Sequence, residues 1–188
     1  MRQNSALRCA AIAAAALLTA VSLPTTAVSA APAAVTAPSA VTSHGRLAYS
    51  VGLNTATWRV CVSGWTEGQN ASYTAISRIS ALDVNASGVG CPGSWNLSST
   101  AASYPDGWYG VTSCFNPAGS RCAGTSIKLN GRTVTTTTQW TKTATHEFGH
   151  AAGLGHRSTN SSCMTQGAAP PIVTTYDQHD KDSVNANY

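Results

Sequence analysis

Charged side chains are scarce in this sequence. They make up 10% of its 188 residues, and the 11 Lys and Arg residues are scattered rather than gathered into a run. Proteins that hold nucleic acid or an anionic membrane surface by charge carry a basic patch or stripe. The sequence therefore predicts neither kind of partner.

Long hydrophobic runs are almost absent as well. The longest, residues 9–23, is shorter than the roughly 20 residues that a membrane-spanning helix needs. Arg2 and Arg8 precede this run and three small residues, 28–30, follow it, an order that is typical of a secretory signal peptide. We therefore expect residues 1–30 to be a signal peptide and the mature protein to be secreted, extracellular and free of the membrane.

The rest of the chain divides into a short lead and one domain. Residues 31–44 are a stretch of Ala, Pro, Val, Thr and Ser without periodicity, which indicates a short propeptide or a flexible lead. From Gly45 onward the composition is that of a globular protein without internal repeats. Residues 45–188 are therefore expected to form one domain, long enough to bury a core.

No Cys-x-x-Cys pair occurs, which argues against a zinc site built from cysteine thiolates. Loss of the signal peptide leaves five cysteines, and secretion favours disulfides between them. Five is an odd number, so at most two bridges form within the chain. Cys114 and Cys122 flank a turn-like stretch, residues 116–119, which we expect to connect two strands, and they are the pair that we expect to be bridged.

The order of predicted elements indicates an α+β fold. Strands are predicted at three β-rich stretches, residues 58–62, 108–112 and 125–129, with further short strands and loops over 89–104. A first helix is predicted after Asn70 as its N-cap, because apolar residues recur there at helical spacing. These are Tyr73, Ile76, Ile79 and Leu82.

Two further helices are expected in the second half. One begins near Thr141 or Thr143 and ends near Ala152, where Gly153 is suited to a left-handed cap. Before it, residues 133–138 are interpreted as a strand or an extended loop. A closing helix over residues 180–188 places Val184 and Tyr188 on one face.

One stretch contains the candidate metal ligands. Residues 146–156 read His-Glu-Phe-Gly-His-Ala-Ala-Gly-Leu-Gly-His. His146 and His150 are four residues apart, so both imidazoles project from one face of a helix. Gly153 lets the chain turn sharply and bring His156 back as a third ligand. Imidazole nitrogens are ordinary zinc ligands, and three of them leave a fourth position for water, which marks a catalytic site rather than a structural one.

Glu147 has the position of a general base. It follows a ligand directly, so it can reach a metal-bound water without binding the metal, and it is one of only two glutamates in the chain. Zinc lowers the pKa of such a water to about 7 and polarises a carbonyl. The pattern predicts one zinc ion and gives no indication about calcium.

The stretch resembles the signature of the metzincin clan of zinc proteases, His-Glu-x-x-His-x-x-Gly-x-x-His followed by a Met-turn. Met164, in Ser-Cys-Met-Thr, matches the Met-turn position. Residues 182–188 resemble the final helix of the matrixin-like members, and residues 127–130 resemble their last strand. The resemblance covers about residues 125–188.

This resemblance implies a metzincin-like α+β protease domain with a twisted mixed sheet, an active-site helix, a C-terminal helix and a cleft. It also implies that Met164 forms a hydrophobic floor under the metal. The sequence departs from relatives in two places. Gln166 stands where astacin-like proteins have a tyrosine, so a tyrosine fifth ligand is not expected, and residues 31–44 lack the cysteine that blocks the zinc of matrixin proproteins.

The resulting prediction is a secreted zinc-dependent endopeptidase that acts on proteins or peptides and is a monomer. An extended substrate would pair with a strand edge near residues 108–112. Pro170, Pro171 and Ile172, which follow the Met-turn, would wall the pocket for the residue after the cut. The alternative is a secreted binding module that uses zinc and tryptophans to hold a protein or glycan without cutting it, and the intact Glu147 argues against it.

Overall fold

A five-stranded sheet carries the fold. The computed structural model describes residues 52–167 and 173–188. The strands are β1 (Thr57–Gly64), β2 (Asn85–Val89), β3 (Leu97–Ala102), β4 (Gly110–Ala118) and β5 (Arg121–Asn130), and the helices are α1 (Thr66–Ile79), α2 (Thr137–Ala151) and α3 (Gln178–Asn187). The strand order is β2-β1-β3-β5-β4, with β4 antiparallel to β5 at one edge and all other neighbours parallel. The predicted α+β class with a mixed sheet is confirmed.

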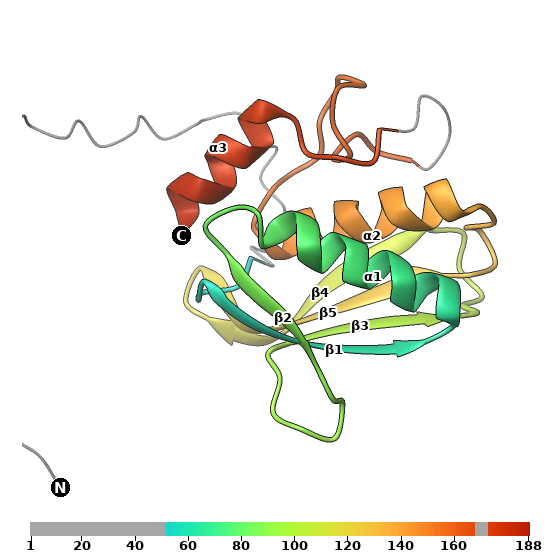
Figure 1. The fold of residues 1–188 in the computed structure, drawn as a ribbon, viewed down its shortest axis with the longest axis horizontal. Helices are drawn as coiled ribbons and strands as arrows, with labels where there is room; N and C mark the ends of the chain where they lie inside the picture. Colours follow the sequence, from blue (N-terminus) through green and yellow to red (C-terminus); the bar gives the residue numbers. More distant parts are fainter. Residues whose placement is uncertain (1–51, 168–172) are drawn as a thin grey trace, which may run out of the picture. The chain divides into compact units, whose positions relative to one another are not determined.

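Helices α1 and α2 lie side by side against the same face of the sheet (Figure 1). The core lies between the two layers and includes Trp58, Leu97 and Ile127 from the strands and Ile79 and Phe148 from the helices. Alternate apolar residues of β1 and β3 are buried in this core, namely Trp58 and Val60 on β1 and Leu97 and Ala101 on β3.

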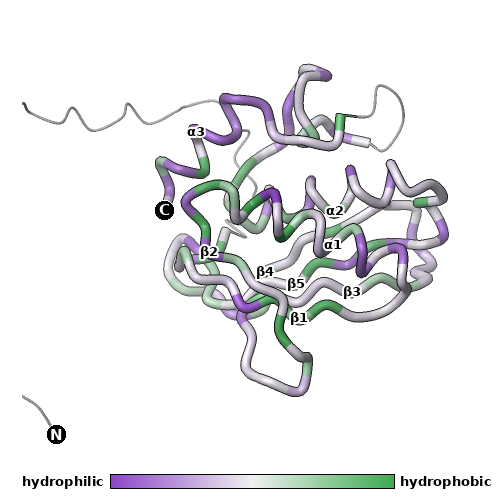
Figure 2. Tube along the Cα trace, viewed as in Figure 1, coloured by the Kyte–Doolittle hydropathy of each residue, from purple (hydrophilic) through white to green (hydrophobic). Residues whose placement is uncertain are grey.

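Helix α3 follows the segment that leaves α2. It is hydrophilic along most of its length (Figure 2) and buries one apolar residue, Val184. Tyr188 also packs on the core, and its ring meets that of Trp58 edge to face at 6.0 Å. The expected shared face of Val184 and Tyr188 is therefore found.

Helix α1 begins at Thr66, earlier than the sequence predicted from Asn70. Its buried face consists mainly of small residues, which carry little hydropathy and gave no apolar signal. Gly68 shows why they are small, because a Cβ atom there would lie 2.1 Å from the Cβ of Ala101. Tyr73, which was predicted to lie on the apolar face, is 50% exposed.

Helix α2 also begins earlier than predicted. Thr136 is its N-cap, and a reciprocal capping box joins Thr136 to Gln139, with Oγ1 accepting from the Gln139 amide at 3.2 Å and Oε1 accepting from the Thr136 amide at 3.1 Å. A capping box satisfies two amides that the first turn leaves open. The interpretation of residues 133–138 as a strand or an extended loop is therefore wrong for the last two residues, which are helical.

Strands β4 and β5 form a hairpin that turns at Gly119, where φ is 63°. The predicted Cys114–Cys122 disulfide is present, but it joins two paired strands, so the residues between them are mostly strand rather than the expected loop. A second disulfide joins Cys61 to Cys91, and Cys163 is a buried free thiol. Two bridges and one thiol agree with the odd cysteine count.

Three predicted segments lie outside the described residues. They are the signal peptide at 1–30, the lead at 31–44, and the pocket-wall residues Pro170, Pro171 and Ile172. Within the described ranges, the helices are too short or too polar to cross a lipid bilayer.

Candidate metal centre

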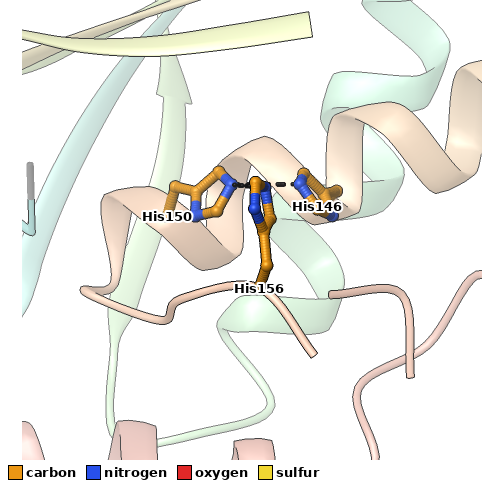
Figure 3. Close-up of side chains that lie close together, drawn as sticks. All are labelled: His146, His150 and His156. Atoms are coloured by element: carbon orange, nitrogen blue, oxygen red, sulfur yellow. Dashed lines mark hydrogen bonds between the residues drawn. The ribbon is translucent and has the colours of Figure 1, made fainter. Parts of the chain in front are cut away.

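Three histidines converge beside the C-terminal half of α2. Nε2 of His150 lies 3.0 Å from Nε2 of His146 and 3.2 Å from Nε2 of His156 (Figure 3). Ligands arranged tetrahedrally about 2.0–2.1 Å from a zinc ion stand about 3.3 Å from one another. The spacing of the three nitrogens therefore fits a zinc ion.

The tautomers of the two helical histidines are fixed by carbonyl groups. Nδ1 of His146 donates to the carbonyl of Cys163 at 2.8 Å, and Nδ1 of His150 donates to the carbonyl of Leu154 at 2.7 Å. A carbonyl only accepts, so each Nδ1 carries the proton and each Nε2 keeps its lone pair directed toward the other histidines. This is the arrangement that orients imidazole ligands in metal sites.

Burial keeps these rings neutral. It lowers the pKa of His146 well below the usual 6.5 and that of His150 to about 4. Burial also lowers the pKa of His156, with a further contribution from the positive charge of Lys142. All three rings are therefore neutral near pH 7, which is the protonation state that binds a metal.

The turn after α2 serves both the helix end and the site. Gly153 adopts φ of 91°, as the sequence predicted, and its amide donates to the His150 carbonyl at 2.8 Å. The amide of Leu154 donates to the Gly149 carbonyl at 2.9 Å, which completes a Schellman motif. The same turn places the Leu154 carbonyl against His150 and directs the chain back toward His156.

Met164 packs beneath the turn of α2 that separates His146 from His150. It is fully buried, and a Cβ atom at Gly149 would lie 2.3 Å from its sulfur. The amide of Arg157 donates to the Met164 carbonyl at 2.9 Å, so the residue after His156 is paired with the Met-turn. The helix, the third histidine and Met164 are thus held as one packed unit.

Glu147 is 4% exposed and lies beside the histidines. Its Oε2 accepts a hydrogen bond from the hydroxyl of Thr112 at 2.6 Å. Burial raises the pKa of Glu147 to about 7, against the lowering effects of that bond and of Lys142. A Cβ atom at Gly110 would lie 2.7 Å from both Cγ and Oε1 of Glu147, so this carboxylate has room only because the strand carries a glycine there. A carboxyl group with a pKa near neutrality suits proton transfer in both directions.

The site opens into a cavity of about 550 Å³. Its walls come from the start of β4 and the loop before it, from α2, and from the chain after the Met-turn. The lining residues are Gly107, Trp108, Tyr109, Gly110, Val111, Thr112, Lys142, Thr143, His146, Glu147, His150, His156, Gln166 and Gly167. Because β4 is an edge strand, the part of it that borders the cavity belongs to a free edge of the described sheet.

The sequence did not single out three polar residues that support the site. Thr112 holds Glu147, Lys142 lines the cavity, and Arg157 bonds Asp177 at 3.1 Å and His179 at 2.7 Å. Lys142 had a visible signal, because it lies four residues before His146 and so shares its helix face. Thr112 and Arg157 had none, since their partners lie more than 15 residues away in sequence.

A second group of possible ligand atoms is formed by Asp177, His179 and Asp180. The guanidinium of Arg157 lies against it, through the bonds to Asp177 and His179. A fixed positive charge in contact with two of the three groups disfavours a metal ion there. In the described part of the chain, the three-histidine cluster is therefore the better candidate for a metal site.

Comparisons with known proteins agree with this geometry. Residues 63–188 match the matrixin family. Among 82 solved chains that match is archaemetzincin from Methanopyrus kandleri, with a TM-score of 0.53 and 12% sequence identity over 71% of this chain and 97% of that one, a likeness that shows the fold. A search of curated proteins gives no match. Since the matched region spans more than half of the chain and includes the whole histidine motif, the chain belongs to the matrixin family and is, by class, a zinc metallopeptidase.

Proposed function

We propose that the protein is a secreted endopeptidase that holds one zinc ion through His146, His150 and His156 and uses Glu147 as its general base. The proposal depends on one observation. The Nε2 atom of His150 lies 3.0 Å and 3.2 Å from the Nε2 atoms of the other two histidines, beside a buried carboxylate at the wall of a cavity. Residues of these types in this arrangement suit hydrolysis assisted by a metal.

A zinc ion held by His146, His150 and His156 would supply Lewis-acid chemistry, which polarises a carbonyl and acidifies a water molecule. Glu147 takes a proton from the attacking water and later gives it to the departing amine. Thr112 keeps the carboxylate from turning away, because its hydroxyl holds Oε2. The carbonyls of Cys163 and Leu154 keep the imidazoles of His146 and His150 in the tautomer that binds metal.

The substrate backbone is expected to lie along β4. Residues Gly110 to Thr112 line the cavity and belong to an edge strand, whose outward amides and carbonyls can pair with an extended peptide. Such pairing requires only backbone groups and no terminal amine or carboxylate of the substrate, so it suits an internal bond of a long chain. This supports endopeptidase activity over removal of terminal residues.

Two measurements test the proposal. Purified protein is expected to contain about one zinc per chain and to cleave casein, with loss of cleavage on addition of a chelator and recovery on addition of zinc. Glu147→Gln is expected to keep zinc and lose about 10²–10⁴-fold or more of the rate, because an amide cannot accept the proton. Glu67→Gln, at the only other glutamate of the chain, is the matched control and should retain full activity.

A Glu147→Gln variant that cleaves casein at the native rate contradicts the assigned base. A wild-type protein that holds zinc and cuts no protein favours the alternative, a binding module. Secretion is tested separately, because the extracellular form is expected to begin at Ala31 or later when its N-terminus is sequenced.

A further inference from the structure

Lys142 is a buried cation in the wall of the cavity. It lies on α2 one helical turn before His146, is 5% exposed, and lines the same cavity as the three histidines and Glu147. A lysine side chain is rarely fully buried unless it has a charged partner. Its position beside the candidate metal site therefore calls for an explanation.

Its ammonium group contacts backbone carbonyl oxygens, which carry no formal charge. Nζ donates to the carbonyl of Thr165 at 2.5 Å and to the carbonyl of Gly167. Over residues 52–167 and 173–188 no carboxylate lies within 4.0 Å of Nζ, and the third N–H has no acceptor. The negative charge of Glu147 acts on the ammonium only from a longer distance. The Oε2 atom of Glu147 is held by the hydroxyl of Thr112 instead.

Two carbonyls satisfy hydrogen bonds but do not neutralise the charge. A cation taken out of water without a counter-charge is costly, and the cost is offset when an anion arrives. The other side chains that line the cavity are neutral apart from Glu147, which already serves the proposed general-base role. An anion that enters the cavity thus meets an ammonium group that no carboxylate of the described residues contacts.

We propose that Lys142 makes this protease selective for substrates that place an acidic side chain, Asp or Glu, in the cavity next to the scissile bond. This inference rests on the proposed endopeptidase function and names the substrate class for the same site. The ammonium donates its remaining N–H to the substrate carboxylate, while the Thr165 and Gly167 carbonyls keep it in place. Lys142 is thus a specificity-determining residue rather than a participant in bond cleavage.

The Thr165 and Gly167 contacts also suggest a purely structural role, in which Lys142 only fastens the chain after the Met-turn to α2. The two roles predict different results. A fastener changes the rates for all substrates together, whereas a carboxylate receptor changes the ratio of rates for acidic and neutral substrates. That ratio is therefore the quantity to measure.

The experiment uses pairs of internally quenched peptides that are amidated at the C-terminus and differ only in Glu against Gln at one position. The substitution is scanned through the three positions on each side of the cut. At one position the zinc-loaded wild type is expected to favour Glu by about tenfold or more in kcat/KM, the size expected for a charge pair shielded from water. The preference should weaken at high salt.

Two variants and one control complete the test. Lys142→Gln keeps a donor for the carbonyls but lacks the charge, and Lys142→Met lacks both. In each, the ratio of Glu to Gln rates should fall to about one, while Lys128→Met, at an exposed lysine on β5, should leave it unchanged. Because the ratio is taken within one protein preparation, partial unfolding of a variant does not distort it.

The outcomes separate this inference from the proposed function. Cleavage of the peptides with no position that favours Glu overturns the role of Lys142 and leaves the endopeptidase proposal standing. A Glu preference that survives in both Lys142 variants also overturns it. Wild-type protein that holds zinc but cuts no peptide or protein overturns the proposed function and this inference with it.

Discussion

The two regions that build the candidate metal centre are held in different ways. Helix α2 supplies His146, Glu147 and His150, and from Thr143 onward all of its residues are buried. The C-terminal segment, which we define as residues 153–167 and 173–188, supplies His156 and Met164 and contains one short helix. His156 is exposed, and its Nδ1 has no partner within the described ranges, unlike the Nδ1 atoms of His146 and His150.

Contacts between distant side chains and backbone groups hold the C-terminal segment. Arg157 bonds Asp177, the N-cap of α3, and Arg78 of α1 donates to both oxygens of Thr174. Tyr176 donates its hydroxyl to the carbonyl of Thr145 at 2.7 Å. The comparison indicates that regular helix geometry orients two ligands, whereas the third depends on a few separate contacts. Metal affinity should therefore be more easily altered in the C-terminal segment than in α2, with less effect on the fold.

The largest effect is expected where the two regions meet. Met164→Ala should lower the free energy of unfolding by about 2–5 kcal/mol, because it opens a cavity under the helix turn at Gly149. Met164→Leu, of similar volume, should cost less than about 1.5 kcal/mol. Denaturant unfolding of the metal-free proteins measures both. Equal small losses would mean that Met164 does not pack the two regions together.

His150 on α2 and His156 in the C-terminal segment should contribute differently to the stability of the metal-free protein. In metal-free protein, His150→Ala leaves the buried Leu154 carbonyl without its donor and should cost about 1–3 kcal/mol of unfolding free energy. His156→Ala removes an exposed ring and should change it by no more than about 0.5 kcal/mol. Both variants should lose zinc. Similar stability losses for the two would break the contrast between the regions.

The Arg157–Asp177 contact should affect the metal more than the fold. Arg157→Gln is expected to speed zinc dissociation by about tenfold, the lower end of the effect of residues that support metal ligands. Transfer of zinc to a coloured chelator in stopped-flow mixing measures the rate. Arg132→Gln, at an exposed arginine, is the control. An unchanged dissociation rate in Arg157→Gln would show that His156 is positioned without this contact.

The smallest expected change in stability concerns the N-caps of α2 and α3, each of which belongs to a capping box. Thr136→Ala removes the N-cap of α2 and should cost about 1 kcal/mol without changing zinc dissociation. Asp177→Ala removes the N-cap of α3 at a similar cost, but it also removes the Arg157 contact and should speed zinc release. Asp177→Asn keeps a capping side chain, so it should retain the stability and still speed the release. Identical dissociation rates in all three variants would count against the comparison.

The features that were predicted correctly are determined by residues close together in the sequence. The helix that carries His146 and His150, the turn at Gly153 and the Cys114–Cys122 pair each depend on residues a few positions apart. The errors have local causes too. The start of α1 was missed because small residues on its buried face give no apolar signal, and the threonines before α2 suggested a strand although Thr136 and Gln139 form a capping box.

The sequence by itself determined the candidate metal ligands as a set, because spacings of four and six residues and a glycine that permits positive φ specify how three imidazoles can meet. Only the tertiary structure decided what surrounds them. The bond of Thr112 to Glu147, the carbonyl of Cys163 on His146, and the carbonyl of Thr165 on Lys142 all arise where segments 17 or more residues apart are packed together. Such contacts follow from how the sheet edge and the C-terminal segment pack on α2, and no local periodicity encodes that packing.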